Sequence, residues 1–160
     1  MTEDYASRMS DLVLRLYELC QERQVHFAAR YGLRVAEFRC LRTLWKEGNS
    51  PIRHLAELMN LSPARLTRIV EDLRKKGLVE RHEPEDDRRF KIVNLTPKGR
   101  KLAAEMTREY DEMHRQILAL LQNPSLGTVV DTFEDLIHAM ELWSDEHLAD
   151  HAEKHSGETS

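Results

Sequence analysis

Thirteen Lys and Arg side chains are crowded into the middle of the chain, between residues 51 and 101, where there are eight Asp and Glu. Residues 102–160 have the opposite balance, with three Lys and Arg against thirteen Asp and Glu. The formal net charge of the 160-residue chain is -4, so the positive charge is concentrated rather than general. Because clustered Lys and Arg bind phosphate groups, this distribution predicts a nucleic-acid-binding segment attached to a more acidic part.

The arginine best suited to reading a DNA base falls on a predicted helix that begins at Ser62 and Pro63 and ends at Gly77. Ser is a preferred N-cap, Pro is tolerated at the first helical position, and Gly commonly follows the last turn. At 100° per residue, the apolar face of this helix holds Leu66, Ile69, Val70 and Leu73. The opposite face holds Ala64, Arg68, Glu71 and Lys75. Since arginine can bind guanine through two hydrogen bonds and glutamate can accept one from cytosine, we expect Arg68 and Glu71 to face base edges.

The first turn of the same helix is suited to phosphate. Its backbone N–H groups are unpaired and lie at the positive end of the helix dipole, so they attract anions. We expect Arg65 to contact phosphate there. The full set of DNA-contacting residues that we predict on this helix and just before it is Arg53, Ser62, Ala64, Arg65, Thr67, Arg68, Glu71 and Lys75.

The spacing of apolar residues predicts the other helices and strands, against which this helix packs. Helical spacing and end signals predict long helices over about 9–31, 35–45, 97–122 and from 126 onward, with a polar tail after His147 that we expect to fray. Ser50 and Pro51 predict the start of a short helix, with Ile52, Leu55, Leu58 and Met59 as its buried side chains. Residues 78–82 and 90–95 predict two strands joined by a charged turn.

Two short helices joined by a tight turn and followed by a hairpin predict a mainly α fold with a small β-wing. This is a winged helix-turn-helix whose long N- and C-terminal helices form a dimerisation region. We assign residues 35–101 to the DNA-binding lobe, and residues 1–34 and 102–160 to the dimerisation region of one intertwined domain.

Four segments of the chain carry a resemblance to a known family. They are residues 62–73, then Lys76-Gly77-Leu78-Val79, then Asp87-Arg88-Arg89, and then Val93-Asn94-Leu95-Thr96-Pro97-Lys98-Gly99. With these segments the chain resembles the MarR family of transcriptional regulators over roughly residues 9–147. The resemblance implies a homodimer that binds double-stranded DNA at a palindromic operator, most often as a repressor.

The resemblance also implies roles for the wing. The wing tip would enter the minor groove, where Arg89 would insert while Asp87 holds its guanidinium in place. Arg88 and Lys91 would then reach the DNA backbone.

A small-molecule effector is a further implication of the resemblance, bound in a crevice between the dimerisation region and the DNA-binding lobe. The expected effector is an aromatic carboxylate, a phenol or a related thioester. Arg15 and His26 lie about three helical turns apart and could meet a carboxylate and a hydroxyl. Phe38 and Arg39 on the next helix could line the same space. The competing interpretation is that these are surface side chains with incidental ion pairs.

Thiol and metal sensing are alternatives within the same fold. Some family members respond to peroxides through a thiol near the start of the first helix, but here that position falls near Ser10. Cys20 and Cys40 are therefore expected to be small core residues. Three histidines recur at four-residue spacing near the C-terminus and could share a zinc ion, namely His147, His151 and His155. We predict no resident metal or cofactor.

Other classes of protein are less well supported. The sequence contains no motif of a nucleophilic, metal-dependent or phosphate-binding enzyme, so we predict that the chain is not an enzyme. A winged helix that binds an acidic protein instead of DNA is the alternative of a different class. No run of 18 apolar residues occurs and the first residues are acidic, which predicts a cytoplasmic protein without a membrane partner.

Overall fold

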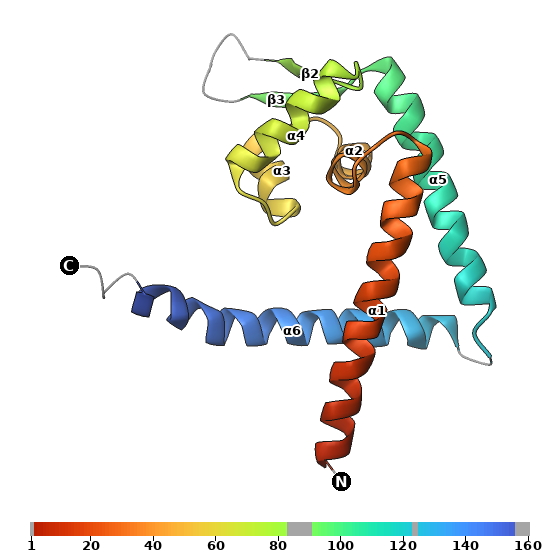
Figure 1. Ribbon diagram of the computed structural model, residues 1–160, viewed down its shortest axis with the longest axis vertical. Helices are drawn as coiled ribbons and strands as arrows, with labels where there is room; N and C mark the ends of the chain where they lie inside the picture. Colours follow the sequence, from red (N-terminus) through yellow and green to blue (C-terminus); the bar gives the residue numbers. More distant parts are fainter. Residues whose placement is uncertain (1, 83–90, 123–124, 156–160) are drawn as a thin grey trace. The chain divides into compact units, whose positions relative to one another are not determined.

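The computed structural model describes residues 2–82, 91–122 and 125–155, with side chains described from residue 4 to residue 147 of these ranges (Figure 1). The elements follow in the order α1 (Thr2–Arg30), α2 (Val35–Glu47), β1 (Ser50–Pro51), α3 (Ile52–Leu58), α4 (Pro63–Lys75), β2 (Val79–His82), β3 (Ile92–Leu95), α5 (Pro97–Ala119) and α6 (Leu126–His155). They fall into two compact units, Met1–Glu112 and Met113–Ser160, which are described separately. This architecture confirms the predicted mainly α fold with a small wing.

The three strands form one antiparallel sheet in the order β1-β3-β2. In the β2–β3 hairpin Val79 lies opposite Leu95 and His82 lies opposite Ile92. Figure 1 shows the hairpin beside α4, which contacts β2. Val79 and Val93 point their side chains into the core, being 2% and 0% exposed. The alternation of buried and exposed residues along the strands is the half-buried pattern expected of such a ribbon.

The start of α3 differs from the prediction at Ser50 and Pro51. These two residues form β1 rather than a helix start, because Ser50 pairs with Val93 and the backbone N–H of Ile52 donates to Lys91 O at 3.1 Å. Pro51, with φ -61° and ψ 145°, is the residue before the first helical one. An antiparallel partner more than forty residues away in sequence thus outweighed the local helix signal.

The turn between α3 and α4 and the start of α4 agree with the sequence signals. Asn60 has a φ of 53°, a left-handed conformation that Asn tolerates better than most residues. Ser62 has an extended backbone, and its Oγ accepts a hydrogen bond from the backbone N–H of Arg65 at 3.3 Å. Pro63 is the first helical residue, and Gly77 follows the helix with a φ of 71°. The helix-turn-helix is therefore confirmed.

The core of the first unit lies between α2, α3, α4, the sheet and the N-terminal half of α5. Its largest fully buried side chains include Phe38, Leu41, Leu44, Leu55, Leu66, Leu73 and Met106. An aromatic cluster adjoins this core, with the ring of Phe27 5.4 Å from Phe38 and 5.1 Å from Tyr110. The prediction that Leu58 of α3 is buried was wrong, since its side chain is 47% exposed.

Helix α5 begins in very close contact with the residues that follow α4. The Oγ of Thr96 accepts from the backbone N–H of Gly99 at 3.0 Å, which confirms Thr96 and Pro97 as a helix start. A Cβ atom added to Gly99 would lie 1.8 Å from the backbone oxygen of Leu78. Only glycine fits at this position, and the first turn of α5 is thereby held against the start of β2.

Several helix ends differ from the predicted ones. Helix α1 begins at Thr2 instead of residue 9, since Glu3 and Asp4 favour the positive end of a helix dipole. Helix α5 ends at Ala119 instead of residue 122. Helix α6 continues to His155, beyond the predicted point of fraying, because Leu, Ala and Glu after His147 are good helix formers.

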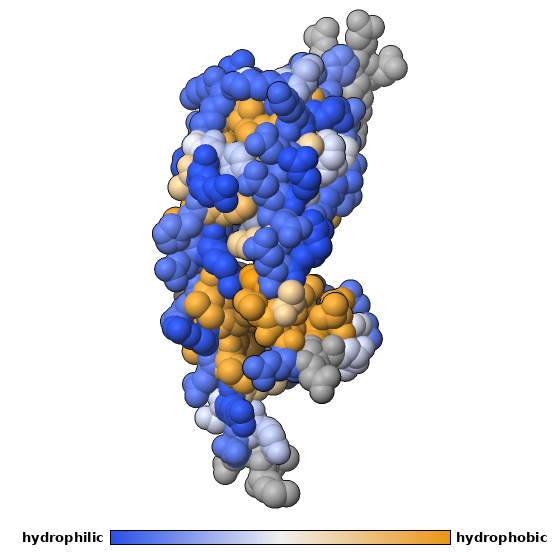
Figure 2. All heavy atoms as spheres, turned by 90° about the vertical axis from the view of Figure 1, so that its right-hand side faces the viewer, coloured by the Kyte–Doolittle hydropathy of each residue, from blue (hydrophilic) through white to orange (hydrophobic). Residues whose placement is uncertain are grey.

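Helices α1 and α6 each carry apolar side chains that their own unit does not cover. Figure 2 shows that apolar residues are exposed at the surface. On α1 they include Met9, Leu12, Leu16 and Leu19, and on α6 they include Phe133, Ile137, Met140 and Trp143. In the described part of the chain, no helix combines the length and the apolar composition needed to cross a membrane.

Candidate nucleic-acid interface

Helix α4 has one buried and one open face, as its periodicity predicts. Leu66, Val70 and Leu73 have no exposed surface and Ile69 is 7% exposed. Arg68 lies on the exposed face, and Glu71, one turn further along it, is partly exposed. The buried face fixes α4 on the core, so the positions of the exposed side chains relative to the lobe are set by packing rather than by chance.

The first turn of α4 is stabilised by its own side chains. In addition to the Ser62 cap, the hydroxyl of Thr67 donates to the backbone oxygen of Pro63 at 2.8 Å. Ala64 and Arg65 are exposed beside them. Thr67 can still accept a hydrogen bond through its oxygen, but its proton is used within the helix. The turn therefore presents a fixed set of exposed backbone and side-chain groups.

Glu71 is engaged by a neighbour on the same helix. Arg74 donates to both of its carboxylate oxygens, from Nε at 3.0 Å and from a terminal nitrogen at 2.8 Å. These contacts with Arg74 lower the pKa of Glu71, and they raise the pKa of Arg74 in turn. Glu71 can accept from a base only by sharing its oxygens with Arg74. The sequence prediction missed Arg74, although the three-residue spacing of an acid and a base on a helix indicates such a pair.

The remaining residues of the predicted interface are distributed around α4. Arg53 on α3, Lys75 at the end of α4 and Lys91 before β3 are all exposed. Asp87, Arg88 and Arg89 lie outside the described residues, so their roles at the wing tip stay predictions. Arg81 of β2 was not predicted; its guanidinium donates to the backbone oxygen of Thr67 at 3.2 Å and joins the wing to α4.

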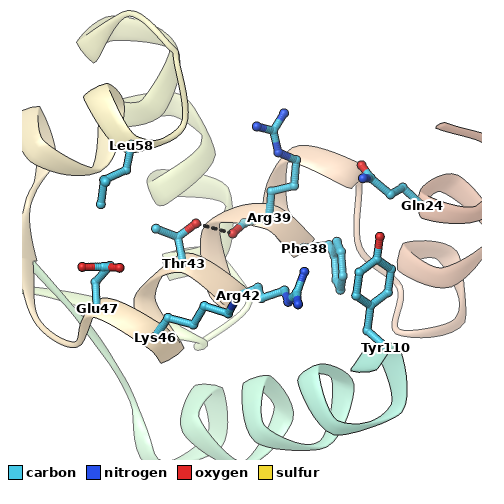
Figure 3. A pocket seen from close by; sticks show the side chains of 9 residues that line it. All are labelled: Gln24, Phe38, Arg39, Arg42, Thr43, Lys46, Glu47, Leu58 and Tyr110. Carbon is cyan, nitrogen blue, oxygen red and sulfur yellow. Dashed lines mark hydrogen bonds between the residues drawn. The ribbon is translucent and has the colours of Figure 1, made fainter. Parts of the chain in front are cut away.

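A pocket of about 310 Å³ opens beside α2 (Figure 3). It is lined by residues of α1, α2, α3 and α5, namely Gln24, Phe38, Arg39, Arg42, Thr43, Lys46, Glu47, Leu58 and Tyr110. Three of these residues are basic and one is acidic. The two rings supply an apolar wall, so the pocket has the composition to hold a small anionic molecule with an aromatic group.

Two of the four predicted effector residues line this pocket and two do not. Phe38 and Arg39 are in its lining. Arg15 is instead an exposed residue of α1 that pairs with Glu18 at 3.7 Å. His26 Nδ1 lies 2.9 Å from the backbone oxygen of Glu22 in the preceding turn. The helical spacing of Arg39, Arg42 and Lys46 on α2 could have indicated the lining, because residues three and four apart share a face.

Arg42 is the most constrained cation of the pocket. A terminal nitrogen donates to Asp111 at 2.8 Å, and its guanidinium lies 4.7 Å from the centroid of the Tyr110 ring. Figure 3 shows it beside the rings of Phe38 and Tyr110. Its Nε is buried and has no hydrogen-bond partner in the described part of the chain. A buried donor without a hydrogen-bond partner carries an energetic cost.

The two cysteines differ in environment. Cys40 is fully buried in α2, and burial together with the nearby Glu37 raises the pKa of its thiol to about 12. Cys20 is partly buried in α1, and its Sγ accepts a long hydrogen bond from Arg23 at 3.5 Å. Because the thiolate is the reactive form, Cys40 is an inert core residue, as predicted.

The histidine series at the end of α6 is described only at its first member. The ring of His147 stacks on Trp143 with centroids 4.7 Å apart, and its Nδ1 lies 2.9 Å from Trp143 O. The side chains of His151 and His155 lie outside the described residues. Within the part that is described, no three His, Cys, Asp or Glu side chains gather as metal ligands would.

Comparison with known proteins decides the family. The family model described as "MarR family" matches residues 33–91, from just before α2 to just before β3. The HTH-type transcriptional regulator FarR of Neisseria gonorrhoeae is 31% identical over 100 residues, which cover 62% of this chain and 68% of FarR. The chain belongs to the MarR family.

Further relatives of this MarR-family chain are more distant or shorter in alignment. YhbI of Bacillus subtilis (strain 168), an uncharacterized HTH-type transcriptional regulator, is 29% identical over 83 residues, or 52% of this chain. The chain spans about half of that relative, 54% of its length. SPO1453, a MarR family transcriptional regulator from Silicibacter pomeroyi DSS-3, has 26% identity and a TM-score of 0.69, with 81% of this chain and 92% of SPO1453 covered.

A second solved structure supports the fold alone. The S. aureus MepR–DNA complex has a TM-score of 0.70 at 17% identity, with 82% of this MarR-family chain and 97% of MepR covered. FarR, YhbI and SPO1453 are all named as transcriptional regulators. This MarR-family chain is thus a winged-helix protein of the transcriptional-regulator class.

Proposed function

We propose that the chain is a homodimeric repressor that binds a palindromic DNA operator and is released from it by a small aromatic anion. The observation that carries the DNA-binding part is the open face of α4, where Ala64, Arg65 and Arg68 are exposed while the opposite face is anchored in the core. A helix of 13 residues is about 20 Å long at 1.5 Å per residue, which suits the major groove.

The charge around α4 supports a DNA contact. Arg53 on α3 and Lys91 at the base of the wing are exposed and would reach backbone phosphates on either side of α4. Arg65 would bind phosphate at the helix start, and Arg68 would read a guanine. Arg89 would enter the minor groove from the wing tip, as the resemblance implies. The relative MepR has been solved as a DNA complex, which favours this kind of partner.

A second copy of the chain is the partner that would cover the apolar faces of α1 and α6. Leu12 and Leu14 of α1 are each 60% exposed, and Ile137 and Trp143 of α6 are 54% and 57% exposed. Exposed apolar side chains in such numbers are unusual for a monomer and are typical of an interface. A symmetric dimer would also present two copies of α4 to two half-sites about one turn of DNA apart.

The effector part of the proposal rests on the pocket beside α2. Arg39, Arg42 and Lys46 supply positive charge, and Phe38 and Tyr110 supply flat apolar surfaces. An aromatic carboxylate, a phenol or a thioester with an aromatic acyl group fits both features. Such a molecule would change DNA binding only if it binds the DNA-free arrangement of the lobes more tightly.

Selection from a random-sequence DNA pool tests the DNA-binding part. We expect the recovered sequences to share one palindromic site, and binding to that site to weaken steeply as salt is raised. Arg89→Ala should then reduce operator affinity strongly while gel filtration still shows a dimer. A chain that enriches no sequence, or binds every duplex alike, would contradict the proposal and favour a winged helix that binds protein.

A thermal-shift panel tests the effector part. We expect an aromatic acid, a phenol or their coenzyme A thioesters to raise the melting temperature, because a ligand that binds only the folded state stabilises it. The same compound should release the operator in a mobility-shift assay. Arg39→Ala should leave operator binding intact while weakening the response to the compound, and an unchanged dose response would remove Arg39 from the effector site.

A further inference from the structure

The C-terminal end of α4 is held by polar contacts from the turn between α1 and α2 and from the first turn of α2. Lys76, the residue after the last helical one, donates from Nζ to Glu37 Oε2 at 2.8 Å and to the backbone oxygen of Gly32 at 3.0 Å. Arg34 forms an ion pair with Asp72 one turn earlier in α4. Residues 32–37 thus contact α4 at its last two turns. These turns lie at the opposite end of the helix from the start that we propose to face DNA.

Glu37 is the buried member of this group. Its side chain is 1% exposed, and its carboxylate also accepts from the backbone N–H of Arg34 at 2.7 Å. Burial acts to raise the pKa of Glu37, but the Arg34 N–H and the Lys76 ammonium act against it and prevail, so the pKa is lowered. A buried carboxylate requires charged or polar partners, and Lys76 is the one that comes from α4.

Helix α5 holds the same end of α4 from the other direction. The Nζ of Lys98 donates to the backbone oxygen of Lys76 at 3.0 Å, and the Oγ of Thr96 donates to the oxygen of Gly77 at 2.7 Å. These contacts fix the backbone at Lys76 and Gly77. Because the backbone of Lys76 is fixed there, the ion pair between Lys76 and Glu37 acts on the orientation of α4. Lys76 cannot simply move to follow Glu37.

We propose that Glu37 is a positioning residue for DNA binding: through Lys76, its buried carboxylate holds the C-terminal end of α4 and so sets the orientation of this helix on the core and the approach of Arg65 and Arg68 to DNA. This inference rests on the proposed function, in which α4 enters the major groove. Glu37 itself lies inside the lobe, so it acts without touching DNA.

The position of Glu37 also connects α4 to the effector pocket. The two residues that follow it on α2, Phe38 and Arg39, line the pocket. A helix moves as a stiff unit over such short distances, so a shift of α2 caused by an occupant of the pocket would displace the Glu37 carboxylate. The Glu37–Lys76 contact then carries the displacement to the end of α4.

Glu37→Gln tests the positioning role, because it keeps the size of the side chain and an oxygen for the Arg34 N–H but removes the charge that binds Lys76. We expect operator affinity to fall on the order of 10-fold in a dimer that remains folded. The slope of log affinity against log salt should stay unchanged, since no phosphate contact is lost. Lys76→Gln should lower operator affinity at least as much, because it leaves the buried Glu37 carboxylate without its ammonium partner, and the double variant should be no weaker than Lys76→Gln.

Amide hydrogen exchange in the DNA-free dimer provides a readout that is independent of DNA. We expect faster exchange at residues 72–78 in Glu37→Gln, with residues 63–70 little changed. Glu105→Gln, which removes one carboxylate from the exposed side of α5, is the control for net charge and should match the unmodified chain in both measurements.

The outcomes separate the two proposals. An unmodified chain that binds no duplex overturns the proposed function, while unchanged exchange at residues 72–78 in Glu37→Gln overturns the contact as a support of α4. Faster exchange with an unchanged operator affinity overturns the positioning role. Additive losses in the double variant overturn the claim that Glu37 acts through Lys76.

Discussion

The guanidinium of Arg42 lies 4.7 Å from the centroid of the Tyr110 ring, so a cation of α2 is stacked on an aromatic residue of α5. Asp111 accepts from the same guanidinium at 2.8 Å. The two neighbours hold Arg42 in one orientation, with a buried Nε that has no partner in the described part of the chain. A cation held in place in advance binds an anion with little loss of side-chain entropy.

Arg42→Gln is therefore expected to weaken binding of whichever aromatic acid stabilises the chain. Hydrogen bonds to charged groups contribute about 1.5–3 kcal/mol, which corresponds to a loss of roughly 10- to 150-fold in affinity. Calorimetric titration of the acid measures the loss. Arg108→Gln, an equal charge change on an exposed residue of α5, is the control. Equal affinities of the two variants would show that Arg42 does not bind the acid.

Arg68 and Arg65 should affect DNA binding in different ways. Arg68→Ala is expected to relax base preference at one position of each half-site and to cost about 1–3 kcal/mol there. Arg65→Ala should weaken binding to all sequences equally and reduce the salt slope by about 1. Selection from a random pool and a salt titration measure the two effects. An unchanged base preference for Arg68→Ala would exclude a direct contact with a base.

Gly99→Ala should destabilise the fold. The added Cβ would lie 1.8 Å from the backbone oxygen of Leu78, and backbone on both sides must move to admit it. We expect a loss of at least about 2 kcal/mol in the free energy of unfolding. The melting temperature should fall by roughly 5–10 °C in a thermal melt.

Gly127→Ala is the matched control for that substitution. At Gly127, in the first turn of α6, an added Cβ would meet its nearest neighbour, the Oγ of Ser125, at an ordinary 3.7 Å. Alanine in a helix is favoured over glycine by about 0.5–1 kcal/mol, so stability should be kept or slightly raised. Equal destabilisation by both substitutions would show that the contact between Gly99 and Leu78 is not the cause.

Cys40 should not react in the native protein. Its pKa of about 12 leaves on the order of one thiol in ten thousand as thiolate at pH 8, and its side chain is fully buried. In Cys20→Ser, where Cys40 is the remaining thiol, we expect reaction with an aromatic disulfide reagent at least about 100-fold slower than in guanidinium chloride. Rapid native labelling of this variant would instead favour a thiol-responsive regulator.

The contribution of Glu37 to stability should depend on pH. Its folded-state pKa is lowered, so its stabilising effect is present above the ordinary value of 4.5 and is lost as the pH falls through the folded-state pKa. The difference in free energy of unfolding between the unmodified chain and Glu37→Gln is thus expected to be constant near pH 7 and to shrink below about pH 4.5. Urea denaturation at several pH values measures it, and a difference that grows in acid would contradict the assignment.

The elements that depend on neighbouring residues were predicted from the sequence. The cap of Ser62, the first-turn Pro63 and the apolar period of α4 act within one helix, and the alternation in β2 and β3 acts within one hairpin. For the same reason the two faces of α4, and with them Arg65 and Arg68 as exposed groups, were predicted correctly.

Features that depend on contacts between residues far apart in the sequence became visible only in the folded chain. Ser50 and Pro51 form a strand because Val93 is available to pair with Ser50. The pocket is lined by residues of α2 together with Tyr110, and Glu37 contacts Lys76. Both pairings join residues that are too far apart in the sequence for helical or strand periodicity to predict. Arg15 and His26 lie on the same helix as Gln24 but do not line the pocket. Helical spacing predicts which side of the helix a residue occupies, but it does not predict what packs against that side. Burial and charge pairing arise only when the elements pack together. That packing decides which of the candidate side chains line the pocket or form ion pairs.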